Sequence, residues 1–237
     1  MSLVVTVFVP EGIVMAGDSR LTLAYQERKK EGEKPMRVEH QVVLSDNAYK
    51  VEVLQKAGVG VSTFGATIID NMPVTRYIWR FERSEISEGE SVASVANKLV
   101  DYFRSQFPGV EVGFHVCGYR REEEGSIPYV YFCHTTKEAE PKRWNADDEG
   151  ETKFGVIRSG DTHVVDRLID QKSLPVFSAM PLQDAVDYAI YLISTTIETL
   201  RFEPKFPSVG GPIDVLVINP RGMQFVQRKE LRGATEE

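Results

Sequence analysis

The chain has 237 residues, of which 42% are hydrophobic and 27% charged, and its formal net charge at pH 7 is −7. The negative charge argues against nucleic acid or an anionic membrane as the main partner, because both bind basic surfaces. No apolar run reaches the roughly 20 residues of a membrane span, and no signal segment begins the chain, so we expect a cytoplasmic protein.

The first part of the chain predicts two pairs of strands around a charged segment. Residues 2–9 and 13–16 are rich in β-branched and aliphatic side chains and are joined by a Pro-Glu-Gly turn, which predicts a hairpin. Residues 24–47 are mostly charged and predict a solvated insertion loop, with a partner-binding flap as the alternative. Residues 49–54 and 58–63 predict a second pair of strands.

Helices and strands then alternate to the end of the chain. Helical spacing of apolar residues predicts the helices, and apolar runs between turns predict the strands. In chain order these are helices 66–82 and 92–103, strands 112–119, 128–134 and 154–158, helices 161–170 and 182–200, and strands 213–218 and 223–226. Before the second helix, Ser87-x-x-Glu90 resembles a capping box. Strand runs separated by helix pairs predict an α+β fold, a four-layer αββα sandwich of two antiparallel sheets, as one domain over residues 1–237.

The common catalytic and cofactor motifs are missing. The sequence has no P-loop, no G-x-G-x-x-G, no G-x-S-x-G and no H-E-x-x-H, and its four histidines are scattered. Cys117 and Cys133 lie in neighbouring predicted strands and could form a disulfide. Two cysteines in a chain of this length do not form a disulfide framework, so buried free thiols are favoured. We expect no cofactor and no metal.

A candidate catalytic site lies where the first predicted hairpin ends. Counting outward from its turn, Asp18 returns to the neighbourhood of the first residues of the chain. Removal of Met1 would expose Ser2, whose hydroxyl is a nucleophile and whose α-amine, with an ordinary pKa near ~8, is a base. Such a site needs a cation and a carboxylate that holds it, and Lys50 and Asp18 are the candidates.

Each of these residues also has an ordinary structural explanation. Asp18 alone caps a strand end or pairs with Arg20, and Lys50 alone is a surface lysine. Ser159 alone, followed by Gly160, is the N-cap of a helix. Only the joint pattern, with Ser2 at the correct distance from Asp18, favours a catalytic site.

Several segments resemble proteasome-type β subunits of the N-terminal nucleophile hydrolase superfamily. The start SLVVTVFVPEGIVMAGDSRLT has their strand, turn, strand and Asp-Ser-Arg, and its register against the bacterial relatives HslV and Anbu needs no gap between Ser2 and Asp18. AYKVEVLQKAGVGVSTFGA resembles the segment with their catalytic lysine, and GVIRSGD resembles the turn that opens their third helix. PLQDAVDYAIYLISTTI and SVGGPIDVLVI resemble their last long helix with the loop and strand that follow, and this loop is most similar to the Anbu branch.

The resemblance implies an αββα fold, a self-assembling oligomer and peptide-bond hydrolysis through an acyl-enzyme. Ser2 stands where the family has its N-terminal threonine and is implied as the nucleophile, with Lys50 and Asp18 orienting it. A backbone N–H near Thr63 is implied as the oxyanion hole, and Ser159 as support for the amine and a catalytic water. The remaining supporting residues are Gly160, Ser208 and Arg20.

The sequence departs from the family pattern at four places. Serine at position 2 lacks the methyl group that restricts a threonine rotamer. Thr63 replaces a glycine, and the loop 203–207 lacks the aspartate that steadies the terminal amine in active subunits, which leaves Ser208 as its substitute. The charged segment is longer than in HslV. Met-Ser-Leu also resembles a cloning scar, although the gapless register favours a native Ser2.

Three functions therefore compete. The first is a proteasome-like N-terminal serine hydrolase that cleaves peptide or amide bonds. The second is a catalytically silent subunit that acts as an assembly scaffold, and the third is an amidase of the same fold with non-peptide substrates. The partners expected for the first are a peptide substrate and further copies of the chain in a ring or stacked homo-oligomer, with an ATPase unfoldase as a further candidate.

Overall fold

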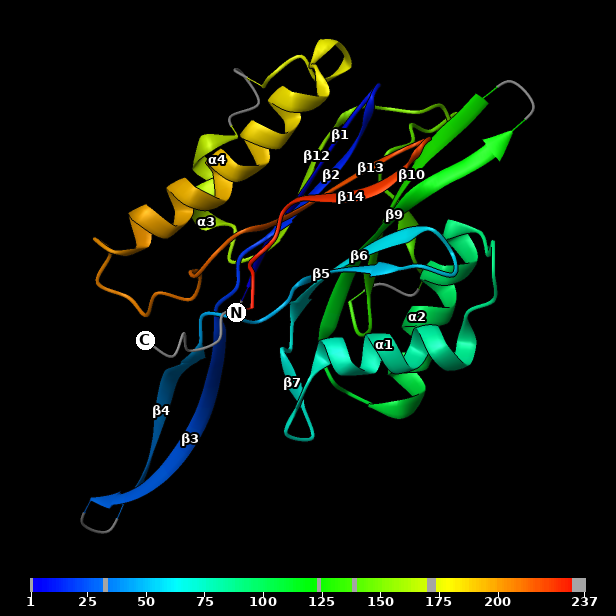
Figure 1. Ribbon diagram of the computed structural model, residues 1–237. Coiled ribbons are helices and arrows are strands. Elements are labelled where there is room, and N and C mark those ends of the chain that lie inside the picture. The colour runs from blue at the N-terminus through cyan, green and yellow to red at the C-terminus, as the bar shows by residue number, and fades with distance from the viewer. Residues whose placement is uncertain (1, 32–33, 123–124, 138–139, 170–173, 232–237) are drawn as a thin grey trace, which may run out of the picture.

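The computed structural model describes residues 2–31, 34–122, 125–137, 140–169 and 174–231. Two five-stranded sheets pack face to face, and a pair of helices covers the outer face of each (Figure 1). The four-layer αββα sandwich predicted from the order of strands and helices is therefore confirmed.

The sheets are built mainly from chain-adjacent antiparallel strands. The first has the order β12-β1-β2-β13-β14, with β1 (Leu3–Val9), β2 (Gly12–Gly17), β12 (Gly155–Gly160), β13 (Asp214–Asn219) and β14 (Gly222–Gln227). The second has the order β11-β10-β9-β6-β5, with β5 (Val51–Leu54), β6 (Val59–Gly65), β9 (Val112–Glu122), β10 (Gly125–His134) and β11 (Lys142–Arg143). Of the ten strands in these two sheets, only the two-residue β11 has no counterpart among the predicted strands.

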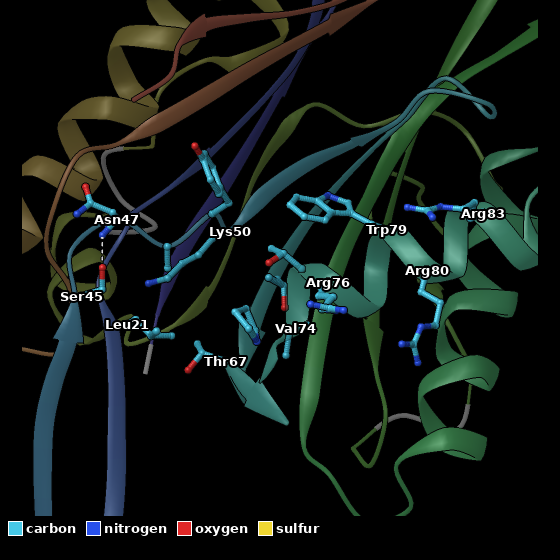
Figure 2. A pocket seen from close by; sticks show the side chains of 15 residues that line it. Leu21, Ser45, Asn47, Lys50, Thr67, Val74, Arg76, Trp79, Arg80 and Arg83 are labelled. Atoms are coloured by element: carbon cyan, nitrogen blue, oxygen red, sulfur yellow. Dashed lines mark hydrogen bonds between the residues drawn. The ribbon is translucent and has the colours of Figure 1, made fainter. Parts of the chain in front are cut away.

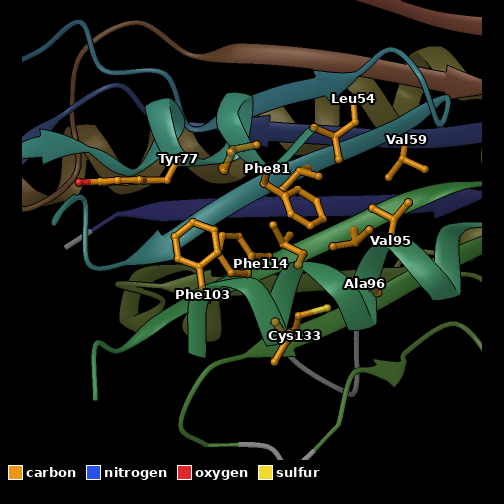
Figure 3. Packing of buried hydrophobic residues seen from close by; sticks show 14 of the residues in the cluster. Leu54, Val59, Tyr77, Phe81, Val95, Ala96, Phe103, Phe114 and Cys133 are labelled. Atoms are coloured by element: carbon orange, nitrogen blue, oxygen red, sulfur yellow. The ribbon is translucent and has the colours of Figure 1, made fainter. Parts of the chain in front are cut away.

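The helices bury the outer faces of the sheets. The second sheet carries α1 (Val74–Glu85) and α2 (Val92–Gln106), and the first carries α3 (His163–Leu168) and α4 (Leu182–Leu200), with a short 3₁₀ turn η1 (Phe177–Ala179) between them. Figure 3 shows Phe81 of α1 and Val95 of α2 packed over Phe114 of the second sheet. Strand β1 is buried on both faces, because Val5 packs towards α4 and Phe8 towards the second sheet.

The first helix begins later than the apolar spacing predicts. Residues Ile68–Ile69 (β7) and Met72–Pro73 (β8) form a small hairpin, and Asp70 and Asn71 between them have φ values of 47° and 62°. Two successive positive φ values are typical of a type I′ turn, for which Asn is a favoured residue. Proline at the helix entrance has a fixed φ and no N–H, so α1 starts directly after Pro73.

The N-terminus of α2 differs from the predicted capping box. The Glu90 carboxylate does accept the Ser87 backbone N–H at 3.1 Å, but the helix is capped by Ser91, whose hydroxyl accepts the Ser94 N–H at 3.2 Å. The box therefore closes the turn before the helix.

The predicted insertion loop is a long antiparallel hairpin. Strands β3 (Leu21–Glu31) and β4 (Lys34–Ser45) pair only with each other and extend away from the sandwich (Figure 1). Leu21, Leu23 and Tyr25 alternate with other residues at the start of β3, but this run is short and the residues that follow, 27–34, are mostly charged. For this reason the charge of the segment predicted a loop.

Both cysteines are buried free thiols, as favoured from the sequence. Cys117 faces the other sheet and Cys133 faces α1 and α2, so the two thiols lie on opposite faces of the second sheet and do not meet. Across the described ranges, no helix combines the length and apolarity that crossing a membrane requires.

Candidate active site

The first hairpin brings Asp18 beside the start of the chain. Strands β1 and β2 pair from Val9 opposite Gly12 to Val4 opposite Gly17, so the residue after β2 lies next to Leu3. The Leu3 N–H donates to Asp18 Oδ1 at 2.8 Å, and the Asp18 N–H donates to the Leu3 carbonyl at 3.2 Å. The carboxylate is therefore held one residue from Ser2, as counting outward from the turn predicted.

Lys50 reaches the same carboxylate from the second sheet. Its Nζ donates to Asp18 Oδ1 at 2.6 Å, and both side chains are almost completely buried. The other oxygen, Oδ2, accepts the backbone N–H groups of Arg20 at 3.1 Å and Gly210 at 3.0 Å. Burial lowers the pKa of Lys50 from its ordinary value, and the neighbouring Asp18 opposes that shift. Asp18 thus has partners on both oxygens and fixes the ammonium group in place.

Ser2 is buried between these groups and β12. Its carbonyl accepts the Asp161 N–H at 2.7 Å, and its hydroxyl has no hydrogen-bond partner among the described residues. Gly160 makes the close approach of β12 feasible, because a Cβ atom there would lie 1.7 Å from the Ser2 carbonyl oxygen and the φ value is +101°. The backbone of the candidate nucleophile is therefore held in position, while its hydroxyl forms no hydrogen bond with the described residues.

A buried histidine orients Ser159. His115 Nε2 lies 2.9 Å from Ser159 Oγ, and its Nδ1 lies 2.9 Å from Thr6 Oγ1. Burial lowers the pKa of His115 to about 3, so the ring is neutral at ordinary pH. In the sequence, this histidine is one of four scattered residues. Its cross-strand position on β9 beside Ser62 of β6 depends on pairings that no local pattern indicates.

The Thr63 amide is not available for the role that the resemblance implies. Its N–H donates to the Lys50 carbonyl at 2.9 Å, which extends the pairing of β6 with β5. The Thr63 N–H itself is therefore already bonded, and an oxyanion hole at an amide near Thr63 stays a prediction. Along a strand, every second backbone N–H points to the same side. The Gly65 N–H therefore points to the same side of β6 as the Thr63 N–H, but it lies past the end of the pairing with β5.

Ser208 lies at the site but supports it through Asp161. Its hydroxyl donates to Asp161 Oδ2, and His163 Nδ1 lies 2.6 Å from Asp161 Oδ1. Burial raises the pKa of Asp161, but the hydrogen bonds from Ser208 and His163 outweigh burial and the net shift is downward. Asp161 therefore links Ser208 to the Ser2 backbone, a connection that no local sequence pattern indicates because Asp161 stands at an ordinary helix entry.

Comparisons with known proteins were made on the whole chain. No family model and no curated protein matches it. Among solved structures, a Gly-1 mutant of Anbu from Hyphomicrobium sp. strain MC1 has a TM-score of 0.61 and 16% identity, over 97% of this chain and 86% of that one. Another Anbu structure from this strain gives a TM-score of 0.62 and 14% identity, over 96% and 86%. Anbu from Yersinia bercovieri, described as an ancestral beta-subunit, gives 0.57 and 14%, over 94% and 86%.

This chain has the Anbu fold. The likeness at these identities concerns the fold, and it agrees with the resemblance that the first hairpin, the Lys50 segment and the last helix predicted.

On this Anbu fold, Asp18 does cap a strand end, since its carboxylate accepts the Leu3, Arg20 and Gly210 N–H groups, but the other ordinary explanations do not hold. Lys50 is buried rather than at the surface. Ser159 lies in β12 and is not the N-cap of α3, a position taken by Thr162. The Arg20 guanidinium pairs with Asp46 at 2.7 and 2.9 Å rather than with Asp18.

Arg20 joins the hairpin to the loop before β13. Its Nη1 donates to the Pro207 carbonyl at 3.1 Å, and a Cβ atom at Gly210 would lie 2.4 Å from its guanidinium carbon. The Asp46 hydrogen bond raises the pKa of Arg20, and the same bond lowers the pKa of Asp46. Arg20 therefore acts on Asp18 indirectly: it packs against Gly210, whose N–H donates to the Asp18 carboxylate.

A pocket of about 670 Å³ opens beside this cluster, between the base of the β3–β4 hairpin and α1 (Figure 2). Lys50 and Thr63 line it, and the wall formed by α1 contributes Val74, Thr75, Arg76, Trp79, Arg80 and Arg83. Its volume is within the range of ligand pockets. Among the residues that the structure describes, no cluster of three or more acidic, histidine or cysteine side chains could hold a metal ion.

Proposed function

We propose that this chain is a proteasome-like N-terminal serine hydrolase that cleaves peptide or amide bonds through an acyl-enzyme once Met1 is removed. The observation that carries the proposal is the Asp18 carboxylate, whose Oδ1 accepts both the Leu3 N–H at 2.8 Å and Lys50 Nζ at 2.6 Å. The carboxylate thus holds the buried Lys50 ammonium beside Leu3, the residue that follows Ser2. The Ser2 hydroxyl is buried and has no hydrogen-bond partner among the described residues. A pocket of substrate size adjoins the same lysine.

The proposed reaction uses the first residue twice. The Ser2 α-amine takes the hydroxyl proton while Oγ bonds to the substrate carbonyl carbon, and the carbonyl oxygen becomes an oxyanion. Collapse of this intermediate breaks the C–N bond, and the α-ammonium returns the proton to the leaving amine. Water then attacks the Ser2 ester, the acid product leaves, and the hydroxyl is restored.

The neighbouring groups prepare the amine and the oxyanion. The Lys50 ammonium lowers the pKa of the α-amine by charge repulsion, which keeps the amine in its basic form near neutral pH. Because the Thr63 N–H is bonded to Lys50, we assign oxyanion binding to the Gly65 N–H, the next amide on that side of β6. Ser159, oriented by His115, and Asp161 would support the amine and the attacking water.

The proposal includes assembly of identical subunits into a ring or stacked oligomer, which the proteasome-like fold supports. Sedimentation velocity of the purified chain tests it, and a monomer at all concentrations would contradict it. A cytoplasmic location and an ATPase unfoldase partner stay predictions from the sequence.

The deciding experiment is intact-mass measurement after treatment with an uncharged β-lactone. We expect loss of one methionine and one lactone adduct on Ser2. Ser2→Ala is the matched control, because alanine is also small enough for methionine removal but has no hydroxyl to acylate. Retention of Met1 would overturn the proposal, since it blocks the amine.

Two further outcomes separate the competing functions. Loss of Met1 without an adduct or any hydrolysis would favour the silent scaffold subunit, for which the bonded Thr63 amide is the supporting observation. An adduct with turnover only of small acyl-amides, and none of peptides, would favour the non-peptide amidase.

A further inference from the structure

One wall of the pocket beside Lys50 is positively charged. Arg76, Arg80 and Arg83 lie on successive turns of α1 and all line the pocket. We call these three residues the arginine wall. Figure 2 shows them along α1, across the pocket from Lys50. No carboxylate is among the residues described as lining this pocket, in a chain whose net charge is −7.

The arginine wall is not neutralised by the protein around it. Within the described ranges, none of its three guanidinium groups forms an ion pair with a carboxylate. The nearest acid on the same helix, Glu82, is turned away and accepts the Lys56 backbone N–H at 3.2 Å. Arg80 lies over the Tyr77 ring, 5.8 Å from its centroid. An exposed helix face normally mixes both signs of charge, so three cations that line one pocket without a carboxylate partner among the described residues favour a bound anion.

The geometry suits several carboxylates better than one. Arg76 and Arg83 are seven positions apart, which on a helix is roughly 10 Å. An extended peptide advances about 3.3 Å per residue, so the wall spans about three peptide residues. Between the arginines, the exposed Trp79 provides apolar surface for aliphatic parts of the same side chains.

We propose that the arginine wall selects peptide substrates that carry acidic side chains beside the bond to be cleaved. This inference rests on the proposed hydrolase function, because the wall matters for catalysis only if Ser2 reacts. Guanidinium and carboxylate groups match in bidentate geometry, which a neutral amide side chain of the same shape does not reproduce.

Binding can be tested without turnover. In the Ser2→Ala variant, a fluorescein-labelled peptide with three successive glutamates is compared by anisotropy with the same peptide carrying glutamines. We expect the glutamate peptide to bind at least about tenfold more tightly at low salt, and the ratio to shrink as ionic strength rises. Equal affinity of the two peptides, or a ratio that salt leaves unchanged, would overturn the inference.

Variants locate the effect. Arg76→Gln combined with Arg80→Gln is expected to remove most of the preference, and Arg76→Lys combined with Arg80→Lys to keep part of it, because charge is retained but the bidentate geometry is lost. Arg221→Gln, in the turn between β13 and β14, removes one charge far from the pocket and is the control. A preference that survives the double glutamine change would also overturn the inference.

The two proposals fail in distinguishable ways. Reaction of Ser2 with the uncharged β-lactone does not depend on the arginine wall. If Ser2 is acylated and the glutamate and glutamine peptides are cleaved at equal rates, only the acidic selectivity is wrong. If Ser2 is never acylated but the acidic peptide still binds through the arginine wall, the hydrolase function is wrong and the pocket is an anionic-peptide site.

Discussion

At the scale of single residues, Gly160 is the position where the site tolerates no side chain. We predict that Gly160→Ala destabilises the fold by more than the about 1 to 2 kcal/mol that a left-handed backbone costs, because its Cβ would lie 1.7 Å from the Ser2 carbonyl oxygen. The variant is also expected to lose β-lactone labelling. Gly109→Ala is the control, since its φ is +80° and nothing lies within 4 Å of the added carbon. Urea unfolding and labelling check both variants, and equal losses would contradict the prediction.

His115 gives a prediction that depends on pH. Its native pKa is about 3, against an ordinary value of 6.5, so between these values the unfolded chain binds a proton that the native chain does not. The free energy of unfolding therefore falls as the pH is lowered through this window, by at most about 1.4 kcal/mol per pH unit. His115→Gln removes the titration and the orientation of Ser159.

We expect His115→Gln to be less stable than the wild-type chain at pH 7, and the difference to shrink by pH 4.5. The rate of Ser2 acylation should fall at every pH, without a shift of the pH profile, because a neutral positioning ring takes up no proton in the reaction. Urea unfolding and labelling rates at several pH values measure both effects. A constant stability difference from pH 7 to pH 4.5 would count against the buried neutral state.

These residues also mark what the sequence could tell. Ser2, Asp18 and Lys50 were predictable because one hairpin and one strand start fix them, and hairpin register follows from turn length. His115 and Asp161 were not, because their contacts with Ser159, Ser208 and the Ser2 carbonyl join segments far apart in the chain. The resemblance places the oxyanion amide near Thr63, but it does not tell which amide of β6 is already bonded to the neighbouring strand.

At the scale of elements, the edge strand β5 carries a buried carboxyl group that lacks a complete set of partners. Burial raises the pKa of Glu52 above its ordinary value of 4.5, while Arg228 and Trp79 oppose the shift. Glu52 Oε1 has no hydrogen bond among the described residues, and Arg228 is 3.6 Å from the other oxygen. Because the native state favours the protonated form, the charged form reduces stability at pH values above the native pKa.

We therefore predict that Glu52→Gln raises the melting temperature at pH 8, by a stabilisation of about 1 kcal/mol, and gives no gain at pH 4, where the carboxyl is largely protonated in both states. Glu88→Gln is the control for loss of one negative charge, since Glu88 is exposed. Calorimetry at the two pH values decides the matter. A loss of stability at pH 8 would mean that Glu52 is held by its partners rather than strained by burial.

The elements were predictable to the extent that they bury an apolar face. Helix α4 shows helical spacing of apolar residues because one of its faces packs into the core, and β1, β2 and β13 show continuous apolar runs because they are buried on both faces. The start of α1 was misplaced because Ile68 and Ile69, which belong to a turn hairpin, continue the helical spacing by chance. The β3–β4 hairpin was missed because its pairing is between backbone groups of a charged segment, and charge patterns do not report such pairing.

At the scale of the whole molecule, the candidate site lies where the two sheets meet. Ser2, Asp18 and Ser159 belong to the first sheet or its strand ends, and Lys50 and Thr63 to the second. Neither layer contains a complete site, so its geometry depends on how the sheets pack. The inter-sheet core around Phe8, Met15 and Cys117 is therefore part of what positions the cation.

The buried ion pair across the sheets permits a direct test of this dependence. Lys50→Met leaves the Asp18 charge buried without its cation, and Asp18→Asn leaves Lys50 without its anion, so each single change is expected to cost about 3 to 5 kcal/mol. The double variant removes both charges together and should cost clearly less than the sum of the single changes. Urea unfolding of the four proteins measures the coupling, with Ser2 labelling expected to be lost in all three variants. Additive costs would mean that the pair does not join the sheets energetically, and that Lys50 is held by its surrounding packing rather than by Asp18.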